Sequence, residues 1–207
     1  MRKPVLIIAI AGASGSGKTT IAHTIMNAMP EGKKCAIICQ DSYYHPVNII
    51  QKKLNGIVNF DHPESFDWEL MRQQIFAIKN NESVDIPIYD YVKHQRQKET
   101  NHLAGVDVLI LEGIYAIYDD ILNKHIDLKV FVQTPKDECL MRRILRDLKE
   151  RGRNIDSIAE QWRTTVSLMY DQYVKPSQIN ADIIVPWSEK NQTALDLLID
   201  VFHHRVI

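Results

Sequence analysis

Short, uninterrupted apolar runs recur along the chain, and amphipathic stretches separate most of them. Runs of this kind are typical of strands that are buried on both faces of a parallel sheet. We therefore predict strands at 5–11, 35–40, 106–113, 127–134 and 181–186.

Apolar residues that recur every three or four positions predict helices between these strands. In the first of them, Ile21, Ile25 and Met29 form one stripe, and a proline and a glycine follow it as a stop signal. Helices are expected at 18–29, 67–78, 136–151, 156–174 and 191–204. The alternation of strands and helices predicts an α/β fold, a parallel sheet with helices on both faces.

The segment 42–105 interrupts this alternation after the second strand. It is rich in aromatic, histidine and asparagine residues and contains one clear helix. Ligands of open α/β sheets bind beyond the carboxyl ends of the strands, so we expect this insertion to cover a substrate. The chain lacks repeats and a convincing linker, and we expect a single domain over 1–207, long enough to bury a sizeable core.

The composition excludes some classes of protein. The formal net charge is -1, so no strong overall field attracts nucleic acid or an anionic membrane. No apolar run approaches the roughly 20 residues needed to cross a bilayer, and the first run leads into a glycine-rich loop, which favours a strand over a signal peptide. The three cysteines, Cys35, Cys39 and Cys139, lack zinc-like spacing and indicate reduced, mostly buried thiols. We expect a cytoplasmic protein.

The stretch "GASGSGKTT" fits the pattern G-x-x-x-x-G-K-[ST] between a predicted strand and a predicted helix. Glycines let successive backbone N–H groups curl around a phosphate, and the helix that follows adds its positive end. The Lys18 ammonium can reach the β- and γ-phosphates, and the Thr19 hydroxyl can bind Mg²⁺. The nucleoside triphosphate is expected on Gly12, Ala13, Ser14, Gly15, Ser16, Gly17, Lys18, Thr19 and Thr20.

Two carboxylates end predicted strands. Glu112 closes "VLILEG", where a second magnesium ligand belongs. Asp41 follows the second strand and could accept the proton of an attacking hydroxyl. A turn aspartate is equally common at such a position, and position alone leaves both interpretations of Asp41 open.

Larger motifs extend this picture. "QDSYY", "NFDHPESFD", "IPIYDYVKHQR", "LEGIYAIYD", "RRILRDLKERGR" and "ADIIVP" occur in an order that resembles the uridine kinase branch of the phosphoribulokinase family. The resemblance covers nearly the whole chain, and "NFDHPESFD" and "IPIYDYVKHQR" are its most specific parts. It implies a P-loop kinase that transfers the γ-phosphoryl of ATP or GTP to the 5′-hydroxyl of uridine or cytidine, giving UMP or CMP, with Mg²⁺. It also implies a homo-oligomer, commonly a tetramer.

The resemblance also implies residue roles. Asp41 matches the general base, and Asp61 matches the carboxylate that binds the ribose 2′- and 3′-hydroxyls, a task suited to an acceptor-only group. Tyr89 and His94 match the pair that reads the pyrimidine edge, and a neutral imidazole can serve uracil or cytosine by changing tautomer. The remaining substrate contacts implied are Tyr44, Phe60, Tyr91, Arg143, Arg153 and Gln161. Taken singly, Tyr89, Tyr91 and His94 are more typical of packing under a long loop than of recognition. Their place in "IPIYDYVKHQR" favours recognition instead.

The stretch "MRRILRDLKERGR" places basic residues on one predicted helix. One interpretation is a solvated helix with pairs such as Arg143–Asp147 and Arg146–Glu150. The other is a lid, roughly 142–165, whose guanidinium groups fold over the triphosphate and exclude water, with Gly152 as a hinge. The resemblance points to Arg146 and Arg151 for phosphate contact, while Arg142 and Lys149 are expected in solvent.

Two alternatives remain open. A relative of phosphoribulokinase or pantothenate kinase would act on another small alcohol. The motif "IPIYDYVKHQR" discriminates against this alternative, because a sugar phosphate has no base edge for it to recognise. A P-loop switch would couple hydrolysis to partner binding and would need a segment ordered by the γ-phosphate. The stretch "PWSEKNQ" departs from the family pattern near the expected donor base, which leaves ATP or GTP open.

Overall fold

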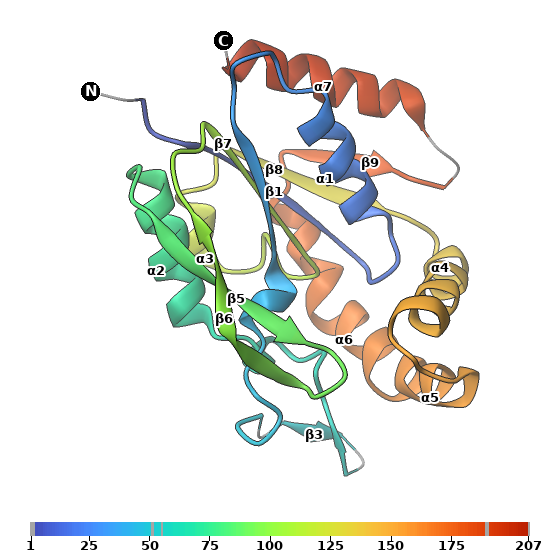
Figure 1. Ribbon diagram of the computed structural model, residues 1–207. Coiled ribbons are helices and arrows are strands. Elements are labelled where there is room, and N and C mark those ends of the chain that lie inside the picture. The colour runs from blue at the N-terminus through green and yellow to red at the C-terminus, as the bar shows by residue number, and fades with distance from the viewer. Residues whose placement is uncertain (1–2, 51, 55, 189–190, 207) are drawn as a thin grey trace.

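Five parallel strands form the central sheet of the computed structural model, in the order β2-β7-β1-β8-β9 (Figure 1). The structure describes residues 3–50, 52–54, 56–188 and 191–206. The strands are β1 (Leu6–Gly12), β2 (Cys35–Cys39), β7 (Val108–Gly113), β8 (Leu128–Gln133) and β9 (Ile183–Pro186). All five lie within the predicted runs or one residue beyond, which confirms the predicted parallel sheet.

Alternate residues of β1 enter two separate apolar layers. Ile8 and Ile10 pack with Ile21 and Phe202, which come from α1 (Lys18–Asn27) and α7 (Gln192–Val206). On the other face, Ile7 and Ala9 belong to a cluster that contains Met71 and Ile75 of α2 (Trp68–Lys79). Helices therefore cover both faces, as the alternating pattern predicted.

The insertion contains more strand than expected. Beside α2 it forms an antiparallel hairpin of β5 (Val84–Asp90) and β6 (Gln95–Leu103), and a shorter pair of β3 (Lys53–Leu54) and β4 (Ile57–Val58). The prediction of a single element here was incomplete because β6 is almost entirely polar and exposed, so no apolar alternation announces it. α2 begins as predicted, with the Asp67 carboxylate accepting from the Leu70 N–H.

After β7 the chain forms a single short turn of helix, α3 (Asp120–Asn123). The helices of the expected lid follow β8. These are α4 (Lys136–Glu150), α5 (Ile155–Gln161) and α6 (Ser167–Met169), with π-helical turns at Trp162–Val166 and Tyr170–Val174. The helix predicted over 156–174 is confirmed, because the segment is helical throughout, but the two π-helical turns interrupt its α geometry.

Two further expectations concern the cysteines and membrane-spanning helices. All three cysteines are free, but only Cys139 is fully buried, while Cys35 and Cys39 are partly exposed. Within the described ranges, no helix has the length and apolar content required to cross a bilayer.

Candidate active site

The phosphate loop joins β1 to α1 and depends on glycine where the backbone is crowded. Gly15 has φ +81°, and a Cβ there would lie 2.3 Å from the Cys139 carbonyl oxygen of α4. Gly17 has φ +98°, and its Cβ would lie 2.5 Å from Trp187 Nε1. Both positions combine a left-handed backbone with a close neighbour, so only glycine fits without distortion.

Lys18 is the first residue of α1 and is buried. Its ammonium donates to the Ala13 carbonyl oxygen at 2.7 Å, across the mouth of the loop. Burial lowers the pKa of Lys18, and the nearby carboxylates of Glu112 and Asp41 oppose that shift. The ammonium therefore lies where an anion would relieve the cost of its burial.

Thr19 and Glu112 meet as the sheet register predicts. β1 and β7 place Ile10 beside Glu112, and the Thr19 hydroxyl donates to Glu112 Oε1 at 3.1 Å. Hydroxyl and carboxylate oxygens are the ligands that Mg²⁺ prefers, and this ion usually keeps several waters and substrate phosphates as its other ligands. The pair therefore fits a magnesium ion held together with a triphosphate.

Asp41 lies in the 3₁₀ turn Gln40–Tyr43, directly after β2. Its Oδ2 accepts from the Tyr91 hydroxyl at 3.0 Å and lies 3.7 Å from Arg151 Nη2. The Arg151 guanidinium also lies over the Tyr91 ring, 4.2 Å from its centroid. Burial, followed by the Asp41 charge, raises the pKa of Tyr91, so its hydroxyl keeps the proton that it donates. The resemblance implied Tyr91 as a substrate contact, and the sequence did not predict this bond.

Four predicted aromatic residues form one cluster beside Asp41. Tyr44 lies 5.2 Å from Tyr89 and 6.2 Å from Phe60, between ring centroids, and Phe60 stacks on His94 at 4.8 Å. His94 has φ +51° in the β5–β6 turn, and burial together with Arg153 lowers the pKa of its imidazole. The Tyr89 hydroxyl is buried and has no hydrogen-bond partner among the described residues. These neutral groups suit a planar, polar ring.

Asp61 is buried near the carboxyl end of the sheet, and its backbone is fixed from two sides. Its N–H donates to Asn59 Oδ1 at 3.1 Å, and its carbonyl oxygen accepts from the Tyr115 hydroxyl at 2.5 Å. Its Oδ2 accepts from Gln161 Nε2 at 3.2 Å and from the Thr165 hydroxyl at 2.7 Å. Gln161 was predicted near the substrate, whereas Thr165 was not.

The arginines of α4 and of the turn after it gather around one buried acid, Asp147. Its Oδ1 accepts from Arg146 Nε at 2.9 Å and from Arg146 Nη2 at 2.7 Å. Nitrogens of Arg143, Arg151 and Arg153 lie 3.6, 3.8 and 3.4 Å from its carboxylate oxygens. Although burial opposes ionisation, these arginines hold the pKa of Asp147 below its usual value.

This cluster corrects the interpretation of a solvated helix. The Asp147 side chain has no exposed surface and that of Arg143 is 5% exposed, whereas a solvated i, i+4 pair would leave both in water. Sequence spacing suggested only local pairs, and the return of Arg151 and Arg153 beyond the helix end completes the cluster. The one signal for Asp147 was an acid enclosed by arginines in "RRILRDLKERGR".

Arg143 connects the phosphate loop with the Asp61 region. Its Nη1 donates to Ser14 Oγ at 2.8 Å and its Nη2 donates to Gln161 Oε1 at 3.0 Å. Gln161 Oε1 also accepts from Arg153 Nη1. These contacts bring together Arg143, Arg153 and Gln161, three of the residues that the resemblance implied as substrate contacts.

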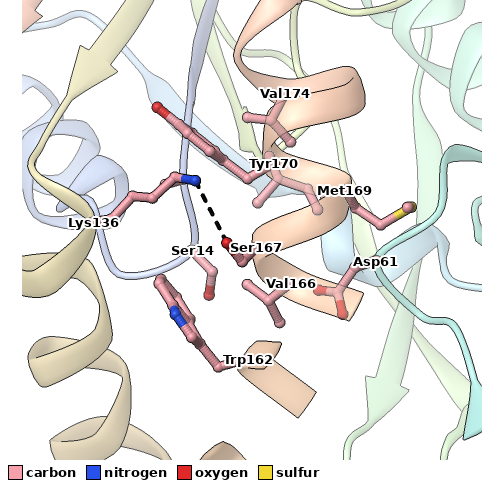
Figure 2. A pocket seen from close by; sticks show the side chains of 11 residues that line it. Ser14, Asp61, Lys136, Trp162, Val166, Ser167, Met169, Tyr170 and Val174 are labelled. Carbon is pink, nitrogen blue, oxygen red and sulfur yellow. Dashed lines mark hydrogen bonds between the residues drawn. The ribbon is translucent and has the colours of Figure 1, made fainter. Parts of the chain in front are cut away.

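A pocket of about 370 Å³, counting space open to solvent, lies between the phosphate loop and the helical segment 162–174 (Figure 2). Ser14 and Asp61 stand at its edge, and Val166, Met169 and Tyr170 form apolar walls. The pocket was not predicted, because it depends on how the helical segment packs against the loop.

Arg142 was expected in solvent, but its side chain contacts two other residues. Its Nη2 donates to the Ser188 carbonyl oxygen at 2.5 Å, and its Nε lies 3.2 Å from Glu138. Arg142 therefore attaches α4 to the "PWSEKNQ" stretch, in which Trp187 packs on Gly17. Glu189 and Lys190 of that stretch lie outside the described residues, so its expected part in the choice of donor base stays a prediction.

The glycine loop holds a buried lysine, and a hydroxyl–carboxylate pair and several arginines lie near it. Together with the parallel sheet, this arrangement defines a P-loop kinase fold and site. The family model "Phosphoribulokinase / Uridine kinase family" matches residues 7–194. A protein named uridine kinase from Ureaplasma parvum is 53% identical over 197 residues, covering 95% of both chains. One from Mycoplasma genitalium is 42% identical over 205 residues, covering 98% of this chain and 96% of its own.

Solved structures agree on the fold. A protein from Silicibacter sp. TM1040 has a TM-score of 0.76 and 22% identity, covering 89% of this chain and 91% of its own. D-glycerate 3-kinase from Cryptococcus neoformans has a TM-score of 0.62 and 16% identity, covering 82% and 79%. The chain belongs to the phosphoribulokinase/uridine kinase family, and it is a kinase.

Proposed function

We propose that this kinase transfers the γ-phosphoryl of ATP or GTP to the 5′-hydroxyl of uridine or cytidine, giving UMP or CMP. One observation carries the proposal: two carboxylates, Asp41 and Asp61, accompany a cluster of neutral aromatic groups at the phosphate-loop end of the sheet. A nucleoside has a primary hydroxyl, a vicinal diol and a planar base, which match these groups in kind. Relatives that are 42% to 53% identical and bear the name uridine kinase support the same assignment.

In this proposal the nucleoside binds through its ribose and through its base. Asp61 accepts hydrogen bonds from the ribose 2′- and 3′-hydroxyls, and Arg143 and Gln161 border it. Tyr89 and His94 read the base edge, and the buried, unpartnered Tyr89 hydroxyl supports such a role, because an unpaired polar group costs stability unless a ligand uses it. Phe60 stacks on His94 and limits where the base can lie.

Transfer then proceeds directly, without a covalent enzyme intermediate. The 5′-oxygen bonds to the γ-phosphorus as the bond from that phosphorus to the departing nucleoside diphosphate breaks, and the 5′-hydroxyl proton passes to Asp41. Lys18, Arg146 and Arg151 stabilise the charge on the phosphoryl group. A magnesium ion held by Thr19 and Glu112 would neutralise phosphate charge.

Tyr91 and Arg151 prepare Asp41 for this step. Both contact Oδ2, and Oδ1 has no hydrogen-bond partner in the part of the chain that the structure describes. Oδ1 is therefore the oxygen that would accept from the 5′-hydroxyl.

The test is release of ADP or GDP from the Mg²⁺ complex of each donor against a panel of acceptors. The panel holds uridine, cytidine, adenosine, thymidine, ribulose 5-phosphate, pantothenate and no acceptor. Release with uridine and cytidine alone is expected, and release with ribulose 5-phosphate, with pantothenate or without any acceptor would overturn the proposal.

The variant Asp41→Asn tests the base within the same assay. It should bind ATP as the wild type does but lose at least about a hundredfold in kcat, the usual contribution of a general base. A near-normal rate would remove Asp41 from that role.

A further inference from the structure

The helical segment that follows α5 departs from α geometry beside Asp61. Residues Trp162–Val166 form a π-helical turn, a rare element that frequently marks functional sites. The turn begins directly after Gln161 and includes Thr165, and both side chains contact the Asp61 carboxylate. The irregular turn and the contact with a buried acid therefore coincide.

Thr165 makes a contact that helical threonines do not usually make. Its neighbour Thr164 shows the common pattern, with its hydroxyl donating to the Glu160 carbonyl oxygen at 2.8 Å. The Thr165 hydroxyl lies 3.2 Å from the equivalent Gln161 carbonyl oxygen but 2.7 Å from Asp61 Oδ2. A hydroxyl has one proton, and the shorter bond to a charged oxygen is the stronger of the two.

The two donors occupy the same oxygen of Asp61. Gln161 and Thr165 both donate to Oδ2, whereas Oδ1 has no donor in the described ranges 3–50, 52–54, 56–188 and 191–206. The Asp61 backbone is fixed at its N–H and its carbonyl oxygen, so rotation of the side chain is the freedom that remains. Thr165 is fully buried and cannot exchange this bond for water, so it restrains that rotation.

We infer that Thr165 is a positioning residue for ribose recognition: its hydroxyl holds Asp61 Oδ2 and so leaves Oδ1 to the substrate's ring hydroxyls. The inference rests on the proposed function of Asp61. It assigns to Thr165 the preference for ribonucleosides over 2′-deoxyribonucleosides, because a carboxylate free to rotate would hold a vicinal diol less well. Thr165 itself touches no reacting atom.

Removal of the hydroxyl tests this inference. Thr165→Val keeps the shape and deletes the donor, and Thr165→Ser restores the donor. Thr164→Val removes the exposed neighbouring hydroxyl and is the matched control. For each variant, kcat and KM are measured with uridine and with 2′-deoxyuridine at saturating Mg-ATP.

The expected result is specific to positioning. Loss of a hydrogen bond to a charged group should raise the KM for uridine about tenfold or more in Thr165→Val, with little change in kcat. The ratio of kcat/KM for uridine to that for 2′-deoxyuridine should fall by a similar factor. Thr165→Ser and Thr164→Val should keep the wild-type ratio.

Two outcomes would overturn the inference, and they differ from failure of the proposed function. An unchanged ratio in Thr165→Val, with the ratio lost in Asp61→Asn, would remove Thr165 alone. Equal losses with both nucleosides, with no rescue by Ser, would mean that Thr165 is merely structural. No phosphorylation of uridine by the wild type would instead refute the proposed function. If Thr165→Val does not fold, Thr165→Ala against Thr165→Ser gives the same comparison, because they differ by the hydroxyl alone.

Discussion

Replacing Asp147 with asparagine removes the negative charge at the centre of the arginine cluster and keeps the shape. The carboxylate is fully buried and has two hydrogen bonds from Arg146, with three further guanidiniums within 4 Å. Removing one partner from a buried ion pair typically costs about 3–5 kcal/mol. Because the Arg146, Arg151 and Arg153 side chains are 24% to 30% exposed and can turn toward water, we expect the lower end, about 3 kcal/mol.

The assay is thermal unfolding of Asp147→Asn beside the wild type, with Asp171→Asn as the control. Asp171 pairs with Lys136 at 2.7 Å on the surface, where such pairs contribute about 0–1 kcal/mol. In a domain of this size, 1 kcal/mol corresponds to about 2–4 °C. The Asp147 variant should therefore unfold about 6–12 °C below the wild type, and the control within about 4 °C.

The pH dependence separates charge from packing. The arginines lower the folded-state pKa of Asp147, so its contribution is fully present above the unfolded value of about 3.9 and is lost as the pH falls through the folded value. The gap between wild type and Asp147→Asn should stay constant from pH 7 to about pH 5 and shrink below about pH 4. A gap no larger than that of the control at pH 7, or one that persists unchanged to pH 3, would refute the reasoning.

Three further predictions concern ligand binding. Gly17→Ala should weaken ATP binding at least tenfold in calorimetry, because its Cβ would lie 2.5 Å from Trp187 Nε1 at a φ of +98°; normal affinity would show that the loop can yield. Glu112→Gln should raise the Mg²⁺ concentration for half-maximal activity at least tenfold, and an unchanged titration would exclude Glu112 as a ligand. His94→Ala should raise KM about fivefold or more for both uridine and cytidine. Since the pKa of His94 is lowered, the wild-type KM for each nucleoside should not change with pH above about 6.5. A KM that increases as the pH falls, with a midpoint above pH 7, would contradict a neutral imidazole.

Much of the fold could be predicted because its signals are local. β1 and β7 are continuous apolar runs, and the glycine loop between β1 and α1 has a fixed spacing. The hairpin β5–β6 was missed because β6 is exposed and polar, so its pairing depends on its partner rather than on its own pattern. The strand order also lies outside local patterning, because it depends on crossovers between distant segments.

The residues of the candidate site also differ in whether a local sequence signal reveals them. Thr19 and Glu112 could be paired from the sequence, since the carboxyl ends of parallel strands meet at one edge of the sheet. The roles of Asp147 and Thr165 could not be predicted. The arginines around Asp147 are close to it in sequence, but their spacing does not show that its side chain is fully buried. Thr165 contacts Asp61 across 104 residues. The bond between Tyr91 and Asp41 was hidden for the same reason, since it joins residues 50 positions apart.

The strand order has a consequence for how the chain folds. β1 and β2 follow one another in sequence but do not pair, and each lies against β7, which begins at Val108. The sheet therefore cannot start to form until the whole insertion has been synthesised or has collapsed, which predicts folding slower than that of a helical domain of equal length. The phosphate loop, which lies between β1 and α1, is thus completed only after strands that are distant in sequence have joined β1.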